Sequence, residues 1–319
     1  MPRAGDGLPG TPGVDTQRLA FLPVLSYFQA IVIGLLQGVT ELFPVSSLGH
    51  SVIIPALLGW HGIVNAESAN ESFYLAFLVG LHVATALALF VYFRDEWVRI
   101  IGGFFHTLRT RKVETKDQRM AWLLITATIP AGIVGLIFEH SFRTLLATPV
   151  AASALLTVNG LILTVGERVR RRQEVRAVAA AHGLNEEGAR RLDTLEYRES
   201  GVIGVAQIGA LAAGISRSGI TMVAGLVRGL DHEDAARFSF LLATPIILAA
   251  GVYKLPDLLG SNGAGIRGQV LVGSVCSAIT AYLAVRFLLR YFERRTLTPF
   301  AIYCLVAGAL STIYFALTW

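Results

Sequence analysis

Long apolar runs separated by short polar segments make up most of the chain. Residues 72–93 are 22 residues without Asp, Glu, Lys or Arg. At about 1.5 Å per residue, a helix of that length covers roughly 33 Å, which is enough to cross a bilayer. Five further runs have this character: residues 120–138, 144–166, 238–253, 268–285 and 296–319. The 238–253 run is short, so we expect its helix to begin earlier, near 235–237. The pattern predicts an all-α fold with six transmembrane helices.

Two other apolar regions, residues 19–60 and 200–230, are less regular. In the first, Gly38, Pro44 and Gly49 interrupt what would otherwise be one long helix. The interruptions predict a broken, partly re-entrant helix that carries polar groups into the membrane.

Composition agrees with a membrane protein. Only 15% of the 319 residues are charged and 54% are hydrophobic, whereas soluble proteins carry about 25% charged residues. The net charge of +5 does not indicate nucleic-acid binding, because the basic residues flank apolar runs and no basic–aromatic recognition pattern is present. Cys276 and Cys304 lie in apolar runs and predict no disulfide or metal framework. Residues 1–23, rich in Gly and Pro, are expected to form a disordered extension, and residues 24–319 one polytopic membrane domain.

Basic residues set the expected orientation. Segments 94–119, 167–199 and 286–295 hold seven, eight and four Lys or Arg residues. Threading six spans through the loops puts all three clusters on one side, which the positive-inside rule makes cytoplasmic. Both termini and the 60–71 loop then face outward, and the 167–199 loop forms a cytoplasmic hairpin.

A weak internal repeat relates the two irregular regions. Gln37 precedes Ser46 by nine residues, and Gln207 precedes Ser216 by nine. The loop assignment brings the first segment in from outside and the second from the cytoplasm. This predicts an inverted-topology repeat, residues 24–139 and 200–319, with two re-entrant helix pairs meeting near the midplane, where such proteins form their sites.

The first polar cluster contains groups suited to phosphate chemistry. Ser46 and Ser47 offer nucleophiles, and His50 lies three or four residues on, within reach as a base or acid. Glu41 could bind a divalent cation, orient His50 or activate water, and Gln37 lies one turn before it. Mg²⁺ or Ca²⁺ would suit Glu41 and Gln37, but only with substrate phosphate supplying further oxygens. A serine after Pro44 is also a common helix N-cap.

The second cluster suits anion binding. Arg217 lies in an uncharged region and needs an anionic partner, and its planar guanidinium matches phosphate oxygens. Hydroxyls and exposed backbone N–H groups nearby add donors: Gly214, Ser216, Ser218 and Thr221. A structural ion pair between Arg217 and Glu41 is the alternative, and the two interpretations are compatible.

These motifs resemble the undecaprenyl-diphosphate phosphatases, also called bacitracin-resistance proteins. Residues 37–50 (QGVTELFPVSSLGH) match their first motif and residues 213–221 (AGISRSGIT) their second. Similarity extends over about 24–318, through residues 81–85, 129–132, 238–242 and 299–303. Ala213 in place of Pro, Leu48 in place of a small hydroxyl residue and Cys304 in place of Arg depart from the family pattern without touching the proposed catalytic set.

The resemblance implies a bacterial plasma-membrane hydrolase that converts undecaprenyl diphosphate to the monophosphate, with its site open to the outer face. It implies Ser47 as nucleophile with Ser46 as rival, and His50 in proton transfer. Glu41 and Gln37 would handle metal or pyrophosphate, and Arg217 with its hydroxyl neighbours would bind phosphate. The expected partners are a polyprenyl diphosphate substrate and membrane lipids, without nucleic acid. The sequence allows a homo-oligomer and does not fix the preferred chain length.

Two other classes of protein share parts of this pattern. A polyprenyl-phosphate flippase or transporter would need Arg217 and a cavity but no nucleophile, so the Ser-Ser-x-Gly-His pattern favours the enzyme. The acid-phosphatase-like lipid phosphatases require a histidine where this chain has Val223, which excludes that class.

Overall fold

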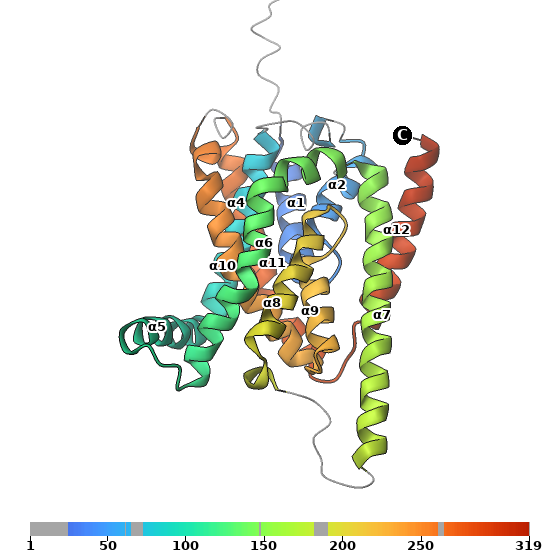
Figure 1. Ribbon diagram of the computed structural model, residues 1–319. Helices are drawn as coiled ribbons and strands as arrows, with labels where there is room; N and C mark the ends of the chain where they lie inside the picture. Colours follow the sequence, from blue (N-terminus) through green and yellow to red (C-terminus); the bar gives the residue numbers. More distant parts are fainter. Residues whose placement is uncertain are drawn as a thin grey trace, which may run out of the picture.

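A computed structural model of the chain describes residues 25–60, 62–64, 73–146, 148–181, 191–260 and 265–318. These residues form helices and turns, with no β-strand among them. The expected N-terminal extension, 1–23, lies outside the described residues. Figure 1 shows the helices packed side by side along one common direction, apart from one helix that lies across their lower ends.

Within the described part of the chain, six helices contain segments long and apolar enough to cross a membrane, as the hydropathy pattern predicts. They are α4 (Phe73–Tyr92), α6 (Lys116–Leu146), α7 (Pro149–Ala181), α10 (His232–Leu259), α11 (Arg267–Phe292) and α12 (Thr298–Thr318). The α10 helix begins before residue 235, which confirms the expected backward extension. The α7 helix continues well into the expected 167–199 loop.

The outer surface of these helices is apolar. Leu271 on α11, Val252 on α10 and Leu317 on α12 are 66%, 72% and 81% exposed. Polar side chains of the same helices, among them Asn159 and Ser277, are instead buried inside the protein. A soluble protein distributes these residue types the other way round. The arrangement therefore fits a multi-pass membrane protein.

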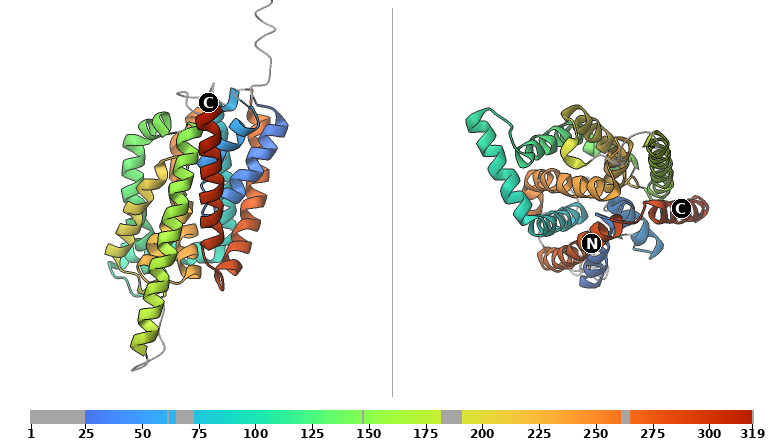
Figure 2. Two further views of the ribbon diagram at one scale, coloured as in Figure 1. Left: turned by 90° about the vertical axis from the view of Figure 1, so that its right-hand side faces the viewer. Right: turned by 90° about the horizontal axis from the view of Figure 1, so that it is seen from below.

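Shorter helices complete the fold. They are α1 (Tyr27–Thr40), α2 (Ser47–Leu57), α5 (Arg94–Thr110), α8 (Tyr197–Ala206), α9 (Arg217–Val227) and the 3-10 helices η2 (Leu192–Thr194) and η3 (Gln207–Leu211). In Figure 1 the pair α1–α2 lies toward the end of the molecule that carries the C-terminus, and α8–α9 toward the end that carries α5. The views of Figure 2 place α12 beside α7, with which it packs closely.

Two tight turns separate the helices within these pairs. Ser46, between α1 and α2, has φ 71°, a left-handed conformation that is rare for a residue with a side chain. Gly214, before α9, has φ 110°, which suits glycine. A Cβ on Gly49 would lie 2.9 Å from the Gly214 Cα, so the two turns approach closely enough to require glycine. The turns from two distant parts of the chain therefore meet.

Candidate active site

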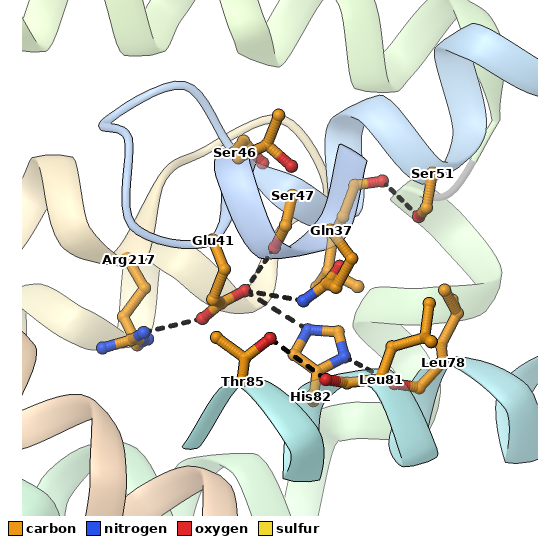
Figure 3. A network of polar contacts seen from close by, with 12 residues as sticks. Gln37, Glu41, Ser46, Ser47, Ser51, Leu78, Leu81, His82, Thr85 and Arg217 are labelled. Carbon is orange, nitrogen blue, oxygen red and sulfur yellow. Dashed lines mark hydrogen bonds and ion pairs between the residues drawn. The ribbon is translucent and has the colours of Figure 1, made fainter. Parts of the chain in front are cut away.

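Glu41 is the centre of a buried polar network. It caps the C-terminus of α1, and its side chain is 6% exposed. One carboxylate oxygen, Oε2, accepts hydrogen bonds from Ser47 Oγ at 2.5 Å and Gln37 Nε2 at 3.1 Å. The other oxygen, Oε1, accepts from Arg217 Nη2 at 2.6 Å. Figure 3 shows these donors converging on the carboxylate from three parts of the fold.

Arg217 brings the second motif to the first. It is the first residue of α9, whose N-cap is Ser216. Its pairing with Glu41 confirms the ion pair that the sequence analysis gave as one interpretation. Its other terminal nitrogen, Nη1, is buried and has no hydrogen-bond partner among the described residues. A buried donor without an acceptor costs free energy, so Nη1 is the unsatisfied donor of this network.

His82, which belongs to neither of the two sequence motifs, also contacts Glu41. It lies on α4, with Nε2 3.4 Å from Glu41 Oε2 and Nδ1 2.8 Å from the Leu78 carbonyl oxygen. A carbonyl and a carboxylate only accept, so both ring nitrogens must carry hydrogens for both contacts to form. The 3.4 Å contact with Glu41 is an ion pair when the ring is protonated. The sequence signal for a role of His82 was its ionisable side chain within the run 72–93, which contains no Asp, Glu, Lys or Arg.

Ser46 and Ser47 have different surroundings. Ser46 Oγ accepts from the backbone N–H groups of Gly49 and Gly214, each at 3.1 Å. It therefore caps α2 and fastens the second turn to the first. Ser47 Oγ instead donates to Glu41 Oε2. The Ser47 hydroxyl is thus the one directed at a base.

Asn159, buried in α7, joins the two turns from the other side. Its Nδ2 donates to the Pro44 carbonyl oxygen at 2.9 Å, and its Oδ1 accepts from the Ser216 N–H at 3.0 Å. The sequence analysis did not single it out, although a buried amide inside a membrane span needs partners. Asn159 fixes the separation of the two motifs.

His50 lies next to the serines but faces away from their hydroxyls. Its Nδ1 donates to the Ser46 carbonyl oxygen at 2.7 Å, which leaves Nε2 to face Tyr303 Oη at 2.8 Å. The His50 and Tyr303 rings also stack, with centroids 5.8 Å apart. No contact joins His50 to either serine hydroxyl in this structure.

The remaining predicted site residues mostly bond protein groups. Ser216 Oγ accepts from Gly219 N–H, Ser218 Oγ donates to the Phe43 carbonyl oxygen, and Thr221 Oγ1 contacts Ser239 Oγ at 2.6 Å. Gln37 reaches the site only through Glu41. Among these four, Ser216 alone lines the cavity described next. The structure thus brings all predicted residues into one region without exposing each of them to a ligand.

A cavity of about 560 Å³ opens onto the network. Its polar lining residues are Glu41, Ser46, Ser47, His82, Thr128, Gln207, Ser216, Arg217, Tyr253 and Lys254. The rest of its wall is mostly apolar and comes from α4, α6 and α10, with Leu75, Leu136 and Ile246 as examples. The cavity therefore joins a site for a charged group to space for a hydrocarbon chain.

The residues of the site fit a divalent cation only in part. Among the described residues, no three His, Cys, Asp or Glu side chains are grouped as a metal site. Glu41 is the one carboxylate lining the cavity, and its oxygens already accept bonds from protein donors. Gln207 Oε1 adds a buried oxygen without a partner. Since Mg²⁺ and Ca²⁺ take six or more oxygen ligands, these groups could hold one only if a ligand supplied most of them.

Fold and site together define a class: a multi-pass helical membrane protein whose buried cavity combines a hydroxyl–carboxylate pair with an arginine and an apolar wall. Residues 30–310 match the family described as Bacitracin resistance protein BacA. The chain belongs to this family.

Curated relatives cover nearly the whole chain. It is 58% identical to "Undecaprenyl-diphosphatase 2" of Frankia alni, over 92% of this chain and 99% of the relative. It is 60% identical to "Undecaprenyl-diphosphatase" of Mycolicibacterium paratuberculosis, over 92% and 98%. A more distant relative, "Undecaprenyl-diphosphatase 2" of Burkholderia orbicola, is 45% identical over 92% and 98%.

Proposed function

We propose that this chain hydrolyses undecaprenyl diphosphate to undecaprenyl phosphate and inorganic phosphate, and so recycles the lipid carrier of cell-wall synthesis. The names of its relatives support the substrate. The observation that carries the proposal is geometric. The Ser47 hydroxyl donates to Glu41 in the same cavity where Arg217 Nη1 lacks a partner. A nucleophile with its base thus lies beside a guanidinium group, whose planar donors match phosphate oxygens.

Ser47 is the proposed nucleophile. Its Oγ attacks the terminal phosphorus, and its proton passes to Glu41 Oε2. The bond from that phosphorus to the bridging oxygen breaks, releasing the lipid monophosphate and leaving a phosphoserine. Water then attacks the phosphoserine, which regenerates Ser47 and yields inorganic phosphate. Ser46 is the weaker candidate because its oxygen already accepts two backbone N–H groups.

Arg217 and His82 supply positive charge for this reaction. With His82 as an imidazolium, Arg217 and His82 exceed the Glu41 carboxylate by one charge, and Lys254 adds a further positive charge to the cavity lining, which favours an anionic substrate. A preorganised cation in a water-poor cavity stabilises charge that develops in the transition state. His82 can also hold Glu41 in line with Ser47. Gly214, Ser216, Ser218 and Thr221 shape the turn that presents Arg217.

His50 remains the proposed proton-transfer group from the sequence motif. Its hydrogen bond to the Ser46 carbonyl oxygen fixes the tautomer that leaves Nε2 basic. That nitrogen faces Tyr303 Oη, so the proposal includes Tyr303 as its proton partner. A cation, Mg²⁺ or Ca²⁺, shared between Glu41, Gln37 and the substrate phosphates is also part of the proposal.

We further propose that α1–α2 and α8–α9 are re-entrant pairs of an inverted repeat. Two features support this. Each second helix has 11 residues and a serine N-cap that accepts from the glycine N–H three positions on. In addition, α1 packs against α11, and α8 packs against α6. In an inverted repeat α1 corresponds to α8 and α6 corresponds to α11, so these two contacts are equivalent.

The proposed location is the bacterial plasma membrane, with the site open to the outer face. Support comes from the basic segments: α5, the end of α7 beyond its span and the end of α11 lie toward the same end of the molecule in Figure 1. The positive-inside rule assigns this end to the cytoplasm. The α1–α2 pair lies toward the other end.

Phosphate release from a C55 or farnesyl diphosphate by detergent-purified protein tests the function. We expect Ser47→Ala to lower turnover by at least about 10³-fold and Arg217→Ala by about 10²- to 10³-fold. Ser51→Ala is the matched control, since its hydroxyl bonds only its own helix at Leu48, and it should stay within a few-fold of the parent. Full activity in Ser47→Ala would remove the nucleophile assignment.

The same assay separates the enzyme from a flippase. Release of phosphate without a membrane or gradient is hydrolysis.

A chelator should abolish release and added Mg²⁺ or Ca²⁺ should restore it. Unchanged release in chelator would remove the shared cation from the proposal.

A further inference from the structure

A second cavity, of about 510 Å³, lies at the far end of α11 from its N-terminus. Its lining consists of Leu283, Arg286, Phe287, Arg290, Tyr291, Arg294 and Arg295. Four arginines thus surround one hollow, and no carboxylate lines it among the described residues. We call this set the arginine pocket.

The arginines of the pocket are free of acidic partners. Among the described residues, none of the four forms an ion pair, whereas other basic residues at this end do: Arg99 with Asp117, Lys116 with Asp193 and Arg237 with Glu96. Glu293 is close in sequence but does not line the pocket. All four are exposed and have no carboxylate partner in the part of the chain that the structure describes, so their guanidinium groups are available to an anion, and phosphate oxygens fit their planar donors.

Two aromatic side chains of the pocket, Phe287 and Tyr291, pack against neighbouring residues. Phe287 stacks on Phe43 with ring centroids 6.0 Å apart and an interplanar angle of 4°. Tyr291 packs on Phe287 at 5.7 Å and donates from Oη to the Thr296 carbonyl oxygen. A flank that only sets membrane orientation needs charge but no shaped hollow. The pocket therefore combines held aromatic rings with unpaired arginines.

The position of the pocket favours a lipid over a soluble anion. Exposed apolar side chains continue from the pocket along the last turns of α11: Ile279, Leu283 and Phe287, which we call the stripe. Arg286 and Arg290 lie in the last turns of the same candidate span. A ligand seated in the pocket can therefore place its acyl chains along the stripe and its headgroup among the arginines.

We propose that the arginine pocket binds the headgroup of an anionic glycerophospholipid, at the membrane face that carries the basic segments. The inference does not depend on the hydrolysis proposed above. A basic pocket at this depth recognises lipid phosphates through charge and hydrogen bonds, and each arginine near an anionic surface contributes about fivefold in affinity.

Native mass spectrometry of the detergent-purified full chain tests the proposal, with phosphatidylglycerol and phosphatidylcholine as probes. We expect one phosphatidylglycerol site at least tenfold tighter than any phosphatidylcholine site. Arg286→Gln with Arg290→Gln should weaken it about 30-fold. The matched control, Arg109→Gln with Lys112→Gln, removes two exposed charges from the same end of the molecule and should change the affinity less than threefold.

The variant Arg286→Lys with Arg290→Lys keeps both positive charges and is the control for misfolding of the glutamine pair. It should bind phosphatidylglycerol with an affinity between those of the parent and the glutamine pair. Three results would overturn the proposal: equal affinity for the two lipids, unchanged affinity in the glutamine pair, or an equal loss in the control pair. The last result would indicate that the affinity comes from the total positive charge at this end of the molecule and not from the arginine pocket.

Discussion

At the scale of single residues, neighbouring side chains of one type do different work. Ser46 holds a left-handed backbone conformation and accepts two backbone N–H groups, while Ser47 donates to Glu41. The two histidines differ in the same way. His82 contacts the carboxylate at the cavity, and His50 lies behind the serines against Tyr303. Hydrogen-bond partners, and not residue type, separate these roles.

A prediction for His82 follows. His82→Gln keeps a donor near Glu41 but removes the positive charge, so we expect kcat to fall about 10²-fold or more. If the imidazolium is the active form, parent activity should fall as pH rises through the titration of the ring. That loss should be absent from the pH profile of the variant.

Thermal unfolding provides the control for this variant, because a structural defect would lower stability without reshaping the pH profile. Unchanged kcat with an unchanged profile would show that His82 has no part in the reaction.

At the scale of elements, the short helix α1 packs against α11 through direct backbone contact, with no side chain between them at Gly34. A Cβ on Gly34 would lie 2.4 Å from the Gly273 carbonyl oxygen of α11, and the nearest other atoms are also backbone. Small residues let membrane helices approach closely, and this packing is what stabilises them in lipid. The α1–α11 contact thereby fixes the end of α1, where Glu41 lies.

Gly34→Ala should therefore destabilise the protein. The added methyl group has to push two backbones apart, at a cost of about 1 to 3 kcal/mol, seen as a lower unfolding temperature in detergent. Gly132→Ala is the matched control, since a Cβ there meets nothing within 4 Å. It should be neutral or stabilising by up to about 1 kcal/mol. Equal stability of the two variants would contradict the role of the contact.

At the scale of the whole molecule, the site exists only where the two halves of the chain meet. Glu41 and Ser47 come from the first half and Arg217 from the second. Asn159 and the Ser46 hydroxyl bridge the halves through backbone groups. Each bridge satisfies buried donors or acceptors that would otherwise cost about 1 to 3 kcal/mol apiece. The bridges set the distance between nucleophile and phosphate-binding group.

Asn159→Leu should lower kcat at least tenfold, because a misplacement of about 1 Å between reacting groups costs as much as 10²-fold. Phosphate release under saturating substrate measures this. Thr164→Ala is the control on the same helix, as its hydroxyl bonds only the Gly160 carbonyl oxygen, and it should retain parent activity. Parent-like kcat in Asn159→Leu would mean that the Ser46 bridge alone positions the halves.

The sequence by itself determined the six spans and the family motifs. Uncharged runs of about 20 residues have few alternatives to a membrane helix, and Glu41, Ser47 and Arg217 stand out because ionisable and hydroxyl groups cluster there in apolar surroundings. Even the Glu41–Arg217 pair could be anticipated, since a buried charge requires a partner.

Only the tertiary structure decided which residues act together. His82 and Asn159 come from spans whose sequence gives no sign of which way a lone polar side chain points. The direction in which His50 faces depends on Tyr303, which lies 253 residues away in sequence. Hydrogen bonds between distant segments depend on helix packing, and packing is set by close approaches such as Gly34 to Gly273 and Gly49 to Gly214. Local sequence patterns do not encode those approaches.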